Sequence, residues 1–101
     1  MSGRTKSGAL RRALCALVPA TDIHIIHERP WHSLTYSGTQ SCLAMDVVDP
    51  TRQDLAAYLT SMLAEYEFDV PGQIVADIAI THAVVAGSTH HLIIDALLLD
   101  D

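Results

Sequence analysis

The sequence predicts a single α+β domain over residues 1–101, with a mainly antiparallel sheet of about five strands and two helices on one face. The first observation behind this is two stretches, 7–18 and 50–66, in which apolar residues recur at helical spacing. The second is a set of short apolar runs joined by turn residues, which favours antiparallel pairing. The third is a strongly apolar closing segment, 74–99. The predicted element order is α-β-β-β-α-β-β.

The first predicted element is the helix over residues 7–18. Ser7 is placed to cap this helix with its hydroxyl, and Pro19 helps to end it. Residues 1–6, which precede the apolar stripe, are predicted to be a flexible tail.

Three strands are predicted to follow this helix. The run 22–28 is typical of a strand, and Pro30 is expected to break it because proline cannot donate to a strand ladder. Segments 31–37 and 41–48 are predicted to be the two arms of a hairpin around Gly38.

The second helix has the clearest pattern in the chain. Asp49 followed by Pro50 predicts its start, with a capping carboxylate and proline at the first helical position. We expect the helix to continue to about residue 66, since its apolar stripe is Leu55, Leu59, Met62, Leu63 and Tyr66.

Two long strands, 74–85 and 90–99, are predicted to close the chain. A type II turn at Val70–Gln73 introduces them, and Gly87-Ser88 suits the tight turn of a hairpin between them. A half-exposed strand should alternate apolar and polar residues, but this segment does not, and it contains no Lys or Arg.

The excess of apolar residues in this hairpin predicts a homodimer, because two short helices can cover only one face of the sheet. Soluble monomers rarely leave a large apolar patch open, and two-fold dimers are the commonest way to bury one. A curved monomeric sheet whose ends wrap onto each other is the alternative. The predicted interface residues are Ile78, Ile80, Val84, Ile93, Leu97 and Leu99.

The composition narrows the classes of partner. The chain has 12 acidic and six basic residues, a net charge of −6, and no Lys or Arg after Arg52. Nucleic acid binding is therefore disfavoured, although the basic segment 4–12 leaves an adaptor role or a targeting peptide open. We predict a cytoplasmic protein that does not associate with membranes, in which Cys15 and Cys42 are reduced.

The best candidate for chemistry is a group of polar residues in the last hairpin. With Gly87-Ser88 as the loop, His82 would face Ile93, and His91 and Asp95 would be its diagonal neighbours. A His–Asp pair could orient a catalytic imidazole, and two of the three residues could hold a metal. The alternative interpretation is that these are ordinary polar residues whose side chains form local hydrogen bonds.

Other patterns for metal or cofactor binding are absent or geometrically poor. His24 and His27 lie in a strand-like run, where they would point to opposite faces. No cofactor or nucleophile motif occurs, so we predict no cofactor and no metal.

The sequence thus favours a small homodimeric domain, structural or protein-binding, without catalytic activity. The alternative is a small-ligand-binding or enzymatic domain that uses His82, His91 and Asp95, with Trp31 and Tyr36 as possible walls.

Overall fold

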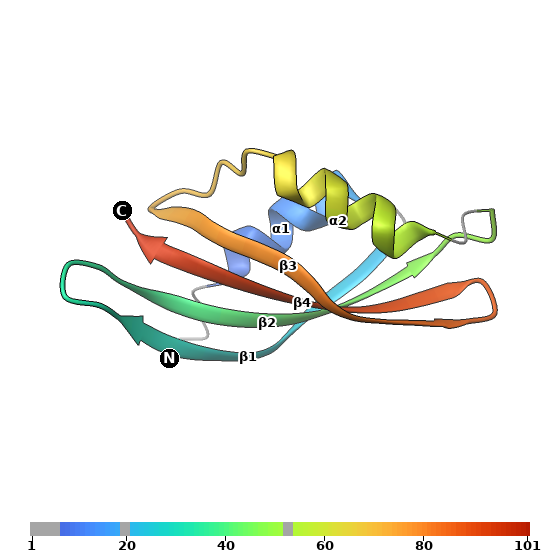
Figure 1. Ribbon diagram of the computed structural model, residues 1–101, viewed down its shortest axis with the longest axis horizontal. Helices are drawn as coiled ribbons and strands as arrows, with labels where there is room; N and C mark the ends of the chain where they lie inside the picture. Colours follow the sequence, from blue (N-terminus) through green and yellow to red (C-terminus); the bar gives the residue numbers. More distant parts are fainter. Residues whose placement is uncertain (1–6, 19–20, 52–53) are drawn as a thin grey trace.

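The computed structural model describes residues 7–18, 21–51 and 54–101, and it has two layers (Figure 1). Two helices pack on one face of a four-stranded antiparallel sheet in which β2 and β4 are central and β1 and β3 are the edges. The elements are α1 (Gly8–Leu17), β1 (Thr21–His32), β2 (Ser37–Val48), α2 (Leu55–Glu65), β3 (Gln73–Ala86) and β4 (Thr89–Asp100). The predicted α+β class and antiparallel sheet are confirmed, and the predicted tail 1–6 lies outside the described residues.

The number of strands was predicted wrongly, because the chain does not break at Pro30. This residue pairs with Thr39 inside a continuous β1, and an edge strand tolerates proline because it needs ladder bonds on one side only. The turn comes later, where Ser33 N–H donates to the Tyr36 carbonyl at 2.8 Å. Gly38 consequently lies within β2, opposite Trp31, and is not a turn residue.

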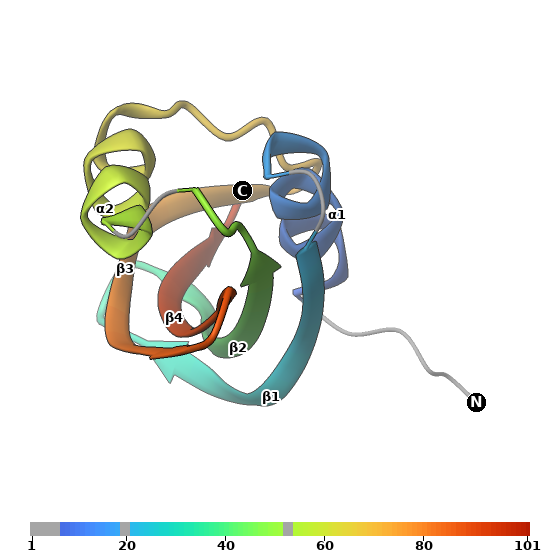
Figure 2. The ribbon, with the colours of Figure 1, turned by 90° about the vertical axis from the view of Figure 1, so that its right-hand side faces the viewer.

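The core lies between the sheet and the helices, as a view along the strands shows: α2 lies over β3 and α1 lies over β1 (Figure 2). Side chains of the central strands alternate between the two faces, and those that face the helices are buried. Together with side chains from α1 and β1 they form the core, whose largest fully buried side chains are Leu10, Leu14, Ile23, Leu43, Met45, Leu92, Ile94 and Leu98.

The first helix is joined to the sheet by buried polar groups, and Ser7 does not use its hydroxyl as a cap. Its backbone N–H and hydroxyl both donate to Glu28 Oε2, and its hydroxyl also contacts the hydroxyl of Ser41. Arg11 Nε donates to the Ile23 carbonyl at 2.8 Å. A side chain predicted to stabilise its own helix instead holds that helix against β1 and β2.

The second helix begins at Leu55, later than predicted. The Asp49 carboxylate accepts hydrogen bonds from the backbone N–H and the hydroxyl of Thr51, so it stabilises a turn instead of a helix end. The predicted apolar stripe is confirmed in part, since Leu55, Leu59 and Leu63 are its buried members.

Both turns of the second half agree with the sequence. Gly72 has φ 75°, and Gln73 N–H donates to the Val70 carbonyl at 3.1 Å, as in a type II turn. Gly87 has φ 64° and lies in the loop between the paired residues Ala86 and Thr89.

Candidate functional site: the helix-free face of the sheet

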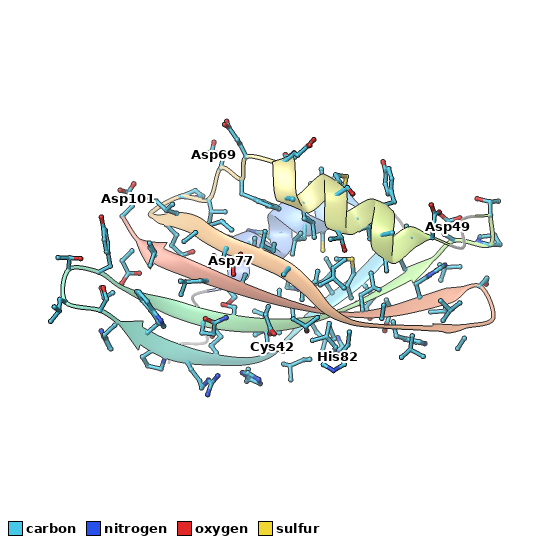
Figure 3. The ribbon with its side chains drawn as sticks, in the orientation of Figure 1. Cys42, Asp49, Asp69, Asp77, His82 and Asp101 are labelled. Atoms are coloured by element: carbon cyan, nitrogen blue, oxygen red, sulfur yellow. The ribbon has the colours of Figure 1, made fainter. Side chains whose placement is uncertain are left out.

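The surface of interest is the side of the sheet that no described helix covers. It consists of the even-numbered residues 38–48 of β2, the odd-numbered residues 89–99 of β4, and the edge-strand residues level with them. We call this surface the helix-free face. Cys42 and His82 point away from the helices there (Figure 3).

The predicted interface residues divide between the two sides of the sheet. Ile78 and Ile80 of β3 are level with Ala96 and Ile94 and pack against the core cluster. The other four lie on the helix-free face; they are Val84, Ile93, Leu97 and Leu99. The dimer interface stays a prediction, and it now consists of these four residues.

The predicted hairpin register is confirmed near the turn, where His82 pairs with Ile93. His82, His91 and Asp95 share the helix-free face, as expected. Each nevertheless has a different neighbour.

His91 Nδ1 lies 2.7 Å from Asp46 Oδ1, and both side chains are partly exposed. His82 Nδ1 lies 3.4 Å from the hydroxyl of Thr81. Asp95 is opposite Cys42 on β2 and is a hydrogen-bond partner of its thiol. The described hydrogen bonds therefore link none of the three candidates to another.

Cys42 is a feature of this face that the sequence did not reveal. It lies between His27 of β1 and Asp95 of β4 in one cross-strand row. Burial raises the pKa of the Cys42 thiol above its ordinary value of 9.0, and the hydrogen bond to Asp95 and the negative charge of that carboxylate raise it further. A protonated thiol is a poor nucleophile, so this row is unsuited to thiolate catalysis.

Only pairing between strands distant in sequence brings Cys42 and Asp95 together, so no local pattern could have found this contact. Cys15 lies on α1, packed against the core on the other side of the sheet. Both cysteines are free thiols, of which Cys42 is buried and Cys15 is half-buried.

A depression of about 290 Å³ lies at the β1 side of the helix-free face. His27, Arg29, Trp31, Gln40 and Asp95 line it, together with Pro30. Trp31 and Asp95 line this depression, but His82 and His91 do not, and Tyr36 lies exposed outside it.

Within the described ranges, no cluster of three or more His, Cys, Asp or Glu side chains is arranged to hold a metal ion. None of the described helices is long and apolar enough to cross a membrane. No protein-family model, curated protein or solved structure matches this chain. The geometry of the helix-free face is therefore the basis for a functional proposal.

Proposed function

We propose that this protein is a self-associating domain, structural or protein-binding, that forms a homodimer through its helix-free face. The observation that carries the proposal is the set of large apolar side chains near its centre, Ile93, Leu97 and Leu99 on β4, which flank Asp95 and are each still partly exposed in one subunit. The two helices lie on the opposite side, and a second copy would remove these side chains from water.

The size of this face supports a second copy as the occupant. Four strands spaced about 4.8 Å apart, each with a rise of about 3.3 Å per residue, give a surface of roughly 19 by 40 Å for strands of this length. The product is about 750 Å², and because the sheet curves toward the helices (Figure 1), this is the upper bound on what each partner buries, against ~800 Å² for an interface of standard size.

Two of the four acidic residues that the described strands place on this face, Asp46 and Asp95, are already paired within one subunit, whereas Asp22 and Asp77 lie on its edge strands. Asp46 is bonded to His91, and Asp95 accepts the hydrogen bond of a neutral thiol. Both carboxylates thus have polar partners within their own subunit, which lowers the cost of covering them.

An enzymatic or small-ligand role for His82, His91 and Asp95 has less support, because each bonds to a different residue outside the group. A general acid–base pair needs its members within hydrogen-bond reach of each other or of a shared substrate.

The two cysteines provide a test with an internal control. Alkylation of Cys42 by iodoacetamide, followed residue by residue by mass spectrometry, should slow as the protein concentration rises, because dimerisation covers the helix-free face. The rate at Cys15, on the other side of the sheet, should stay constant. Equal rates for Cys42 from nanomolar to millimolar protein would overturn the proposal.

A further inference from the structure

We infer that the two copies meet about a two-fold axis parallel to the strands, between β2 and β4, so that Arg29 of each subunit pairs with Asp77 of the partner subunit. This inference rests on the proposed homodimer, and it specifies which of the possible face-to-face arrangements forms.

The register of the sheet supplies the first argument. Arg29 is level with Gln40, Gln40 with Leu97, and Leu97 with Asp77, so these four residues form one row across the helix-free face. Arg29 lies at the β1 edge of that row and Asp77 at the β3 edge. A two-fold rotation about an axis parallel to the strands exchanges the edges and keeps each row in place. The rotation therefore sets each Arg29 against the partner's Asp77.

The charges supply the second argument. Arg29 is the one Arg or Lys that the described residues place on this face. Within the described part of one subunit, neither the Arg29 nor the Asp77 side chain has a hydrogen-bond or ion-pair partner, and both residues are exposed. The proposed axis brings these two opposite charges together twice per dimer, once on each side.

The sizes of the central side chains supply the third argument. On the helix-free face β2 carries small residues level with large ones of β4, namely Gly38 beside Leu99 and Ala44 beside Ile93. Because the proposed axis places β2 over β4 of the partner, Leu99 and Ile93 each meet a small residue, and Leu97 meets Gln40.

The competing two-fold axis runs across the strands and places each strand over its own copy. With that axis at the level of Cys42, Leu97 would lie over Ile93 of the partner subunit, and Arg29 would lie over the partner's His24. Large side chains would then oppose each other, and the basic residue would face no acid. Either axis leaves the strands of the two twisted sheets parallel to each other, so strand direction does not favour one axis. Charge and side-chain size therefore distinguish between the two axes.

Reciprocal charge exchange tests the pairing. Dissociation constants would be measured by sedimentation for the wild type, Arg29→Asp, Asp77→Arg and the double variant. Each single variant places like charges together twice, so we expect each to weaken the dimer at least tenfold. The double variant restores opposite charges and should return to within a few-fold of the wild type.

Two controls carry the same changes of charge outside the helix-free face. Arg12→Asp on α1 and Glu67→Arg after α2 lie at exposed positions, and both should leave the dissociation constant within a few-fold of the wild type. They separate local pairing from the effect of net charge.

The outcomes distinguish the inference from the proposal beneath it. If the wild type dimerises but the single variants do not weaken it, or the double variant does not recover, the pairing is wrong and the dimer stands. If the wild type stays monomeric at every concentration, both fail together.

Discussion

Two neighbouring leucines of β4 separate the stability of the fold from the stability of the dimer. Leu97 lies on the helix-free face, whereas Leu98 is fully buried beneath the helices, at 0% exposure. The same substitution, leucine to alanine, removes the same atoms from opposite sides of one strand. We expect Leu97→Ala to weaken the dimer and Leu98→Ala to destabilise the subunit.

The magnitudes follow from burial. Burying a fully exposed leucine side chain contributes about 1.5–3 kcal/mol, and Leu97 is already mostly covered in one subunit, so about 0.5–1 kcal/mol remains to be gained in the dimer. A symmetric dimer loses two such side chains, or about 1–2 kcal/mol, which raises the dissociation constant by roughly 5- to 30-fold. Leu98→Ala leaves a cavity in the core and should cost about 2–5 kcal/mol of unfolding free energy.

Sedimentation measures the first quantity, and urea unfolding at a concentration where every variant is monomeric measures the second. At that concentration Leu97→Ala should cost clearly less unfolding free energy than Leu98→Ala, because it removes partly exposed atoms and leaves no closed cavity. The reasoning is refuted if Leu97→Ala keeps the wild-type dissociation constant, or if it destabilises the monomer as much as Leu98→Ala does.

Four further substitutions test particular contacts. Gly38→Ala should lower the free energy of unfolding by more than about 2 kcal/mol, since its Cβ would lie 2.0 Å from the carbonyl oxygen of Leu98; an unchanged urea midpoint would contradict this. Glu28→Ala should cost about 1–3 kcal/mol in the same assay, because it removes the acceptor of a buried backbone N–H; a cost below 0.5 kcal/mol, roughly the surface average, would count against that hydrogen bond. Asp95→Asn should lower the pKa of the Cys42 thiol and accelerate its alkylation at pH 8, and an equal or slower rate would refute the assignment. The pKa of the Cys42 thiol is higher in the folded protein than in the unfolded chain, so the unfolded chain ionises first as the pH rises. The stability that the neutral thiol contributes below pH 9.0 is therefore lost above that pH. Cys42→Ala lacks this group, so between pH 8 and about pH 10.5 its free energy of unfolding should fall less than that of the wild type.

Local patterns predicted the parts of the fold that depend on local chemistry. Pro71 and Gly72 define a type II turn by their own backbone preferences, and Gly87-Ser88 determined the hairpin register that pairs His82 with Ile93. The apolar stripe of α2 identified the side chains that meet the sheet.

The predictions that failed depended on distant contacts. Pro30 could be taken as a strand break only while the position of β1 at the sheet edge was unknown. Ser7 was expected to cap its helix, but Glu28 and Ser41 provide stronger partners from two strands. In each case tertiary contacts outweighed a local preference.

The candidate site was predictable only in outline. The apolar hairpin predicted a sheet surface that must be shielded from water, and the two helices shield one face of the sheet. The centre of the other face, the helix-free face, is formed by the pairing of β2 with β4, two strands that α2 separates in sequence. The bulge between Ile80 and His82 turns Ile78 and Ile80 toward the core, whereas Val84 faces away from it, and no local sequence pattern predicted this bulge.

The molar mass in solution tests the central claim most directly. Light scattering on the purified chain at micromolar concentration should give twice the 11.0 kDa of one subunit, with dissociation on dilution. A mass of 11.0 kDa that persists up to millimolar protein would show that one subunit tolerates its uncovered sheet face in water, and the account would be wrong.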